Sequence, residues 1–430
     1  MTKRPSIGEL LEPTLDGEAT IKIIDSAISS RESELRLIAS GLMDISGLGE
    51  FRCLFERIIQ NLDDFSLDYK REWLTSPIVC SWINSMCSLE SWSTGNKKLH
   101  RLLRLSSSIA NKIPPSQSGK IELNSVNGCC FGYTADIVVR GVIGPKLIIE
   151  KSNNSMLLTD ELSKTSFEVS DHDFSKPCEI VISANDNQFK IHKKPTLTGS
   201  RITVRNDVPT LKLMLRSDAP PGRLTGLNYE ELDNSPSTYS EVIDPLPVVN
   251  TAEWLRTSWP EEYNDWLKTM HVIVQRTAPD GWYVGGFSLG AYQGAFWLCQ
   301  TDPIDVFDQC VHEQSHIKLR YIQEFSQIIK DGQNNERFQV PWRTDLRPIS
   351  GIYEGVYVNS HSAIAISKLV DSGFLDSDLL KGFAERHKLL VDHVSIGNSI
   401  LKANAKFTTQ GADFIDWTDS FISKHSKILY

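Results

Sequence analysis

The chain has 430 residues, of which 40% are hydrophobic and 23% are charged, a composition typical of folded globular proteins and unlike that of disordered chains. Its length is sufficient for two or three domains. The formal net charge of −9, without a stretch rich in Lys and Arg, argues against nucleic-acid binding, so small molecules or peptides are the expected partners.

Targeting and redox signals point to the cytoplasm. The early basic residues are not followed by an apolar segment of the kind found in secretory signals, and no apolar stretch approaches the roughly 20 residues needed to cross a bilayer. The eight cysteines include no Cys-x-x-Cys pair. We therefore expect a cytoplasmic protein with reduced cysteines and no membrane partner.

Three regions follow one another along the chain. Apolar residues recur every three or four positions between about residues 24 and 113, which predicts a helical N-terminal region, residues 1–115. Short β-branched segments between about 120 and 216 predict antiparallel strands, and a Pro-, Ser- and Asn-rich loop after them is a candidate linker or lid, giving a second region at 116–245. Helices return at about Thr251, so the third region, 246–430, is predicted to be helical and catalytic. The predicted fold class is α+β, with a metal site on the C-terminal helices.

The third region contains one especially clear helix. The segment GAYQGAFWLC predicts a strand, and TDPIDVFDQCVHEQSHIKLRYIQEFSQII predicts the helix after it, with Thr301 or Asp302 as N-cap and Pro303 in the first turn. The His-Glu-x-x-His motif of CVHEQSHIKL thus lies in the middle of a helix.

This position suits a metal site. Residues four apart on a helix lie one turn apart, so His312 and His316 can direct ring nitrogens at one ion. Two ligands make a weak site, and the next predicted helix offers Glu354, with His361 two turns further along the same face as the alternative. Glu354 is favoured because it is a carboxylate. Cys310 is expected to point away from the histidine face.

Two kinds of chemistry share this ligand set. In gluzincin peptidases, zinc activates water and the glutamate of the motif, here Glu313, is the general base. In non-haem iron(II) oxygenases, two histidines and a carboxylate leave positions open for a 2-oxo acid and O₂. The segment VPWRTDLRP favours the oxygenase, because Arg343 and Arg347 are suited to binding the distal carboxylate of 2-oxoglutarate at two points. The alternative for either arginine is an ion pair with a neighbour such as Asp345.

Three blocks of the sequence resemble a known family. GAFWLCQTDPIDVFDQCVHEQSHIKL, PWRTDLRPISGIYEGVYV and KFTTQGADFIDW are similar to the HEXXH-motif peptide-modification proteins found beside ribosomally made peptide natural products. Some members of that family are iron(II)- and 2-oxoglutarate-dependent peptide β-hydroxylases. The resemblance spans roughly residues 285–417 and leaves the N-terminal helices and the β-rich region outside it.

The resemblance implies a set of roles. His312, His316 and Glu354 would be metal ligands, and Arg343 and Arg347 would bind the co-substrate. The chain departs from the family where Glu354 in GIYEG stands in place of the histidine of its usual Gly-x-x-His-Gly block.

The expected function is hydroxylation of a side-chain Cβ of a ribosomally made precursor peptide with iron(II), 2-oxoglutarate and O₂. Glu313 would support this reaction by orienting a histidine or a bound water. A zinc-dependent peptidase with Glu313 as base is the first alternative. The second is a non-catalytic peptide-binding protein stabilised by a metal.

Overall fold

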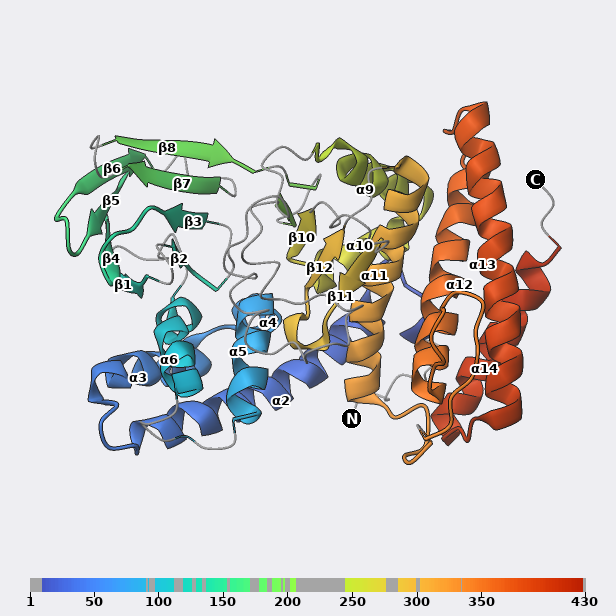
Figure 1. The fold of residues 1–430 in the computed structure, drawn as a ribbon, viewed down its shortest axis with the longest axis horizontal. Helices are drawn as coiled ribbons and strands as arrows, with labels where there is room; N and C mark the ends of the chain where they lie inside the picture. The colour runs from blue at the N-terminus through green and yellow to red at the C-terminus, as the bar shows by residue number, and fades with distance from the viewer. Residues whose placement is uncertain are drawn as a thin grey trace.

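The computed structural model describes residues 10–427 with the following gaps: 90–91, 93–96, 112–118, 126–128, 134–136, 153–154, 171–177, 184–187, 195, 198–201, 206–243, 276–284, 299–301 and 334. Its α+β fold has helices towards both ends of the chain and small sheets between them (Figure 1), which confirms the predicted fold class. The predicted strand at 210–216 and the candidate linker after it lie outside the described residues.

The N-terminal region is helical, as predicted. The side chain of Ser66 accepts a hydrogen bond from the backbone N–H of Tyr69 and so caps one of its helices, and Pro77 opens the next. The helices are α2 (Glu18–Met43), α3 (Arg52–Asp64), α4 (Leu67–Leu74), α5 (Pro77–Cys87) and α6 (Lys97–Ala110).

Two four-stranded sheets follow, in the orders β1-β4-β5-β6 and β2-β3-β7-β8. They enclose a hydrophobic core of their own, which includes Leu147, Leu158 and Ile180. The strands are β1 (Gly119–Asn124), β2 (Cys129–Phe131), β3 (Ile137–Arg140), β4 (Lys146–Lys151), β5 (Ser155–Asp160), β6 (Ser166–Ser170), β7 (Cys178–Ser183) and β8 (Gln188–Lys193).

The prediction that the strands between about 120 and 216 are all antiparallel is wrong at two places: β3 with β7, and the strand Thr203–Arg205, which joins the third sheet in parallel. β3 and β7 pair in parallel. The reason is topological, because the chain leaves β3, forms β4, β5 and β6 in the other sheet, and then returns beside β3 in the same direction. A parallel pair needs a long crossover connection of this kind.

A third sheet lies against the motif helix and has the order β11-β12-β10-β9. β10 pairs in parallel with both β9 and β12, whereas β11 at the edge runs antiparallel to β12. The bounds are β9 (Thr203–Arg205), β10 (Val272–Gln275), β11 (Gly286–Ser288) and β12 (Ala295–Leu298). β12 confirms the strand predicted in GAYQGAFWLC. β10 was not predicted, since four residues that are all buried carry no alternating pattern.

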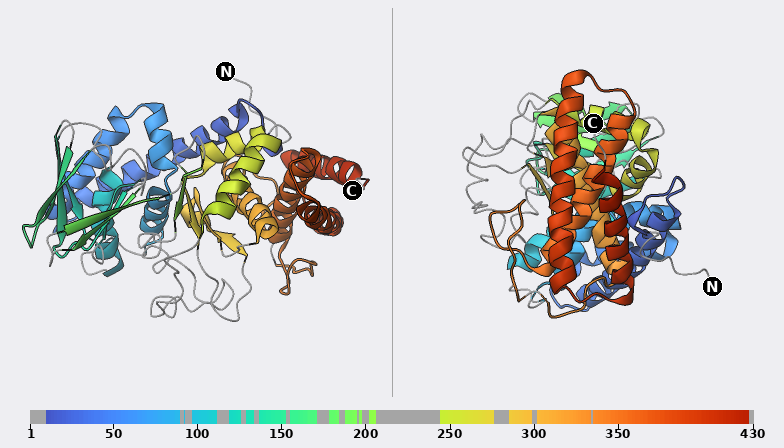
Figure 2. Two further views of the ribbon diagram at one scale, coloured as in Figure 1. Left: turned by 90° about the horizontal axis from the view of Figure 1, so that it is seen from above. Right: turned by 90° about the vertical axis from the view of Figure 1, so that its right-hand side faces the viewer.

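The C-terminal region contains six described helices. α11 carries the motif and lies between the third sheet and α12 (Figure 1), and α12, α13 and α14 run side by side (Figure 2). Asp302 caps α11, because its side chain accepts hydrogen bonds from the N–H groups of Ile304 and Asp305, and Pro303 follows in the first turn as predicted. The bounds are α9 (Leu246–Ser258), α10 (Pro260–Thr269), α11 (Pro303–Phe325), α12 (Ile349–Asp371), α13 (Ser377–Asn404) and α14 (Thr409–His425).

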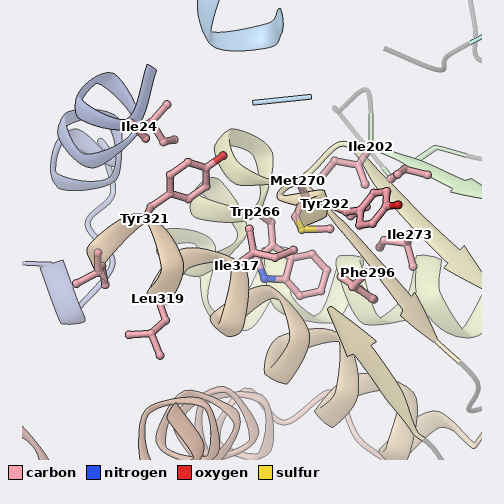
Figure 3. Packing of buried hydrophobic residues seen from close by; sticks show 14 of the residues in the cluster. Ile24, Ile202, Trp266, Met270, Ile273, Tyr292, Phe296, Ile317, Leu319 and Tyr321 are labelled. Atoms are coloured by element: carbon pink, nitrogen blue, oxygen red, sulfur yellow. The ribbon is translucent and has the colours of Figure 1, made fainter. Parts of the chain in front are cut away.

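A large hydrophobic core holds α11 in place. Trp266 of α10, Ile317 of α11 and Phe296 of β12 meet between the helices and the third sheet (Figure 3). The same buried cluster continues from the N-terminal helices to α14, so both helical regions contribute to one core. The domain boundaries at 115/116 and 245/246 therefore stay predictions.

Two further expectations bear on the fold. No helix in the described part of the chain is long and apolar enough to cross a membrane. The cysteines that the structure describes are free thiols, as expected, and Cys80, Cys130, Cys178 and Cys310 among them are buried.

Candidate metal centre

The two histidines of the motif face the same side of α11. The ring centroids of His312 and His316 are 5.1 Å apart, with an angle of 69° between the ring planes. Both residues are partly exposed, whereas the residues between them, Glu313, Gln314 and Ser315, are buried. The helix therefore turns only this histidine face towards the outside.

Cys310 lies away from this face. It is fully buried in the hydrophobic core, where burial raises the pKa of its thiol. This agrees with its expected orientation.

Glu313 connects the motif to the edge strand β11. It is 4% exposed and lies beside Gly286 of that strand, where a Cβ atom would be 3.4 Å from Glu313 Cγ, an ordinary contact distance. Burial raises the pKa of Glu313, although the charge of His312 and hydrogen bonding to Ser288 act in the opposite direction.

Arg320, which the sequence reasoning missed, extends the histidine face by one more turn. Its Nη2 donates hydrogen bonds to the carbonyl oxygen of Ser288 at 3.1 Å and to Ser288 Oγ at 3.3 Å. Its Nη1 is buried and has no hydrogen-bond partner among the described residues. His312, His316 and Arg320 follow one another at intervals of four residues, and this spacing was the signal in the sequence that could have identified Arg320.

The surroundings of His316 favour its neutral form. Burial lowers its pKa well below the ordinary value, and the charges of His312, Arg320 and Arg347 lower it further. His316 is therefore a neutral imidazole near pH 7, which is the form that binds metals.

Arg347, just before α12, and Glu354, in the second turn of that helix, act electrostatically on His316 and Arg320 respectively. The guanidinium group of Arg347 packs on Gly351 in the first turn, where a Cβ would lie 3.1 Å from Arg347 Nε. Glu354 is partly exposed one turn later. Burial lowers the pKa of Arg320. Negative charges nearby oppose this effect, and the largest opposing contribution comes from Glu354.

The third ligand is not brought into place. Within the described residues, no three His, Cys, Asp or Glu side chains are grouped so that they could hold a metal ion. Glu354 as the third ligand stays a prediction. His312 and His316, two imidazoles one helical turn apart, are nevertheless donors of the kind that divalent transition metals prefer.

His361, the alternative third ligand, lies in the protein interior. It is fully buried, its Nδ1 is 3.7 Å from Glu262 Oε2, and its ring stacks on Trp259. Burial favours a raised pKa for Glu262, but His361 and Lys318 outweigh this effect and the pKa is lowered.

The two arginines predicted to bind the co-substrate differ in their surroundings. Arg343 has a side chain that is 42% exposed, and its Nε lies 2.9 Å from Asp345 Oδ1. Arg347 Nη1 lies 3.2 Å from Asp345 Oδ2, but its Nε is buried without a hydrogen-bond partner among the described residues. Both arginines therefore make the ion pair that was the alternative to co-substrate binding, and Arg347 also acts on His316.

Comparison with known proteins does not identify a family for the chain. No family model matches the chain, and no curated protein matches it.

Proposed function

We propose that the chain is an iron(II)- and 2-oxoglutarate-dependent oxygenase that hydroxylates a side-chain Cβ of a ribosomally made precursor peptide in the cytoplasm. The observation that supports this most is the common face of His312 and His316 on α11, whose ring centroids are 5.1 Å apart, with the guanidinium group of Arg320 one turn further along the same helix. A dicarboxylate co-substrate needs cations of this kind beside the metal, because its distal carboxylate must be paired when it leaves water.

His312, His316 and Glu354 would hold the iron. With 2-oxoglutarate and O₂, bound iron supplies the oxidising power that converts a C–H bond to C–OH while 2-oxoglutarate becomes succinate and CO₂. The protein's own contribution is to fix the reactants. The buried helix positions the two imidazoles, and the guanidinium groups orient the co-substrate.

Glu313 has a supporting role in this proposal. Its carboxyl group is buried against β11 beside the first histidine, so it fixes the distance between the metal-binding helix and the edge strand. Groups that support metal ligands in this way tune affinity and orientation without touching the metal.

A zinc-dependent peptidase is the second candidate. It is favoured by the position of Glu313, which follows the first histidine directly and adjoins the edge of the third sheet, where an extended peptide can pair with a strand. In this case Glu313 would take a proton from a water molecule during hydrolysis.

Succinate production separates the two candidates. The full chain is loaded with iron(II) under anaerobic conditions and then supplied with 2-oxoglutarate, O₂ and a library of synthetic peptides. We expect succinate from the wild type, none from His312→Ala or His316→Ala, and a peptide that gains one oxygen atom. Cleavage of peptides by the zinc-loaded chain, with no succinate from the iron-loaded chain, would establish the peptidase instead.

A further inference from the structure

A cleft of about 690 Å³ opens between the N-terminal helices and the sheet β1-β4-β5-β6. Residues of α3 and α6 line one side of it, and residues of β1 and β4 line the other. In Figure 1 these elements lie at the end of the molecule opposite α12, α13 and α14. The volume is typical of ligand sites, and no residue of the candidate metal centre contributes to the lining.

The lining of the cleft carries more positive than negative charge, although the net charge of the chain is −9. The two lysines on the strand side have carboxylate neighbours. Lys146 Nζ lies 3.3 Å from Glu122 Oε2, and Lys120 Nζ lies 3.9 Å from an oxygen of Glu122 and 3.9 Å from one of Glu150. The charged residues of the lining are Arg57, Arg104, Lys120, Lys146, Glu50 and Glu122.

The two arginines on the helix side differ from these lysines. Arg57 Nη1 donates a hydrogen bond of 2.7 Å to the amide oxygen of Asn111, and within the described part of the chain neither Arg57 nor Arg104 forms an ion pair with a carboxylate. A guanidinium group can bind a carboxylate at two points. The helix side of the cleft is therefore suited to acidic groups from outside the chain.

Beside the cleft, a buried carboxylate holds two exposed apolar side chains in place. Asp160 is 2% exposed and accepts hydrogen bonds of 2.7 to 3.0 Å from four backbone N–H groups, in the loop before β4 and in the turn after β5. The two segments meet at Gly144, where a Cβ atom would lie 2.7 Å from the backbone nitrogen of Leu162. They expose Leu162 by 65% and Ile143, two residues before Pro145 of the cleft lining, by 57%. Because these loops are already ordered, a partner that covers the two side chains pays little for arranging them.

We propose that this cleft binds an acidic peptide segment, with carboxylate side chains on Arg57 and Arg104 and an apolar side chain against Ile143 and Leu162. The mixed charges favour a peptide over a phosphate-rich ligand, because the two carboxylates of the lining repel closely spaced phosphates but can pair with basic or polar groups of a peptide. A substrate peptide anchored here has a raised effective concentration at the candidate metal centre, provided that its linking segment spans the two sites. Binding itself does not rest on the reaction at that centre.

The test is a fluorescence anisotropy titration of the full chain, without added metal, against labelled decapeptides. Each probe carries two Asp and two Leu residues, at a different spacing, in a background of Gly and Ser. A second set has Asn in place of Asp, and a third has Ser in place of Leu. At least one Asp-Leu probe should bind the wild type saturably and about tenfold more tightly than both of its substituted counterparts.

Variants locate the binding. Arg57→Gln/Arg104→Gln should weaken binding of the Asp-Leu probe by about tenfold, to the level of the Asn probe. The matched control Arg36→Gln/Arg256→Gln removes the same charge from exposed ion pairs on α2 and α9, outside the cleft, and should change the affinity less than about twofold. Leu162→Ser should weaken the Asp-Leu probe more than the Ser probe, and circular dichroism checks that each variant is folded.

Three results would overturn the inference. The first is a wild type that binds no probe, or binds the Asn probes as tightly as the Asp probes. The second is an equal loss of affinity in the control variant, since a non-specific attraction would then be responsible. The third is displacement of the probe by inorganic pyrophosphate at lower concentrations than by unlabelled peptide, which would indicate a phosphate site. None of these results bears on metal binding by His312 and His316, so the proposed function is tested separately.

Discussion

Lys318 and Asp265 form an ion pair in the interior of the protein. Lys318 Nζ lies 2.5 Å from Asp265 Oδ2, and the two side chains are at most 1% exposed. Thr20 donates a hydrogen bond of 2.7 Å to the other carboxylate oxygen. The pair therefore joins α11 to α10 and α2, two residues beyond the second histidine of the motif.

Breaking this pair on one side should destabilise the fold. Lys318→Met leaves the carboxylate of Asp265 buried and without its cation, which should lower the free energy of unfolding by about 3 to 5 kcal/mol. Urea unfolding followed by circular dichroism measures the change.

Lys402 offers a matched control. Its Nζ also lies 2.5 Å from a carboxylate oxygen, that of Asp419, but these side chains are 46% and 44% exposed. Lys402→Met should cost less than about 1 kcal/mol. Equal effects of the two substitutions would show that the interior pair is not held in a dry environment.

A buried pair of histidines should make the stability depend on pH. His387 Nε2 and His425 Nδ1 are 3.1 Å apart, between α13 and α14, and burial lowers both pKa values from 6.5 to about 4. The unfolded chain takes up protons on these groups as the pH falls through 6.5, whereas the folded chain does so only near pH 4. Stability should therefore fall as the pH is lowered from 6.5 to 4, by up to about 1.4 kcal/mol per pH unit for each histidine.

The contribution of the pair can be isolated. The double variant His387→Gln/His425→Gln should lose stability more slowly over the same pH range, as measured by urea unfolding at several pH values. An unchanged dependence on pH would contradict buried, neutral histidines at these positions.

The features predicted correctly from the sequence are those that depend on residues close together in the chain. The cap of α11 at Asp302, Pro303 after it, and the common face of His312 and His316 depend on residues within a few positions of one another, and the structure agrees with them. The helical character of both end regions followed for the same reason, since the apolar period is a property of each segment by itself.

Long-range relationships could not be predicted in this way. The parallel pairing of β3 with β7 depends on which sheet each strand joins. The approach of Ser288 to Arg320, and of Glu262 to His361, joins segments far apart in the sequence. The sequence pattern placed His361 on the same helix face as Glu354, but only its burial beside Glu262 and Trp259 shows that this histidine is enclosed.

Glu313→Gln distinguishes the two candidate reactions. In a peptidase this substitution removes the base and should slow cleavage by about 10² to 10⁴ or more, while the metal remains bound. In the proposed oxygenase no deprotonated base is required, so part of the succinate production should survive. Loss of all activity with normal iron content would favour the peptidase.

The third ligand can be assigned by comparing two variants. Glu354→Gln should weaken metal binding, because in the proposed centre the partly exposed carboxylate near the start of α12 would be the third donor. His361→Gln should keep the metal, since this residue is buried beside Glu262. Metal content after dialysis is measured for both, and retention in Glu354→Gln with loss in His361→Gln would reverse the assignment.

The most direct test of the account is the stoichiometry of metal binding by the motif. The full chain is purified without O₂, stripped with a chelator, and titrated with iron(II), in the wild type, in His312→Ala/His316→Ala, and in His393→Ala, which removes a partly exposed histidine from α13 as a control. We expect one iron per chain in the wild type and in the control, and none in the double variant. Iron that binds equally well to the double variant, or a wild type that binds none, would contradict the claim that His312 and His316 form a metal centre.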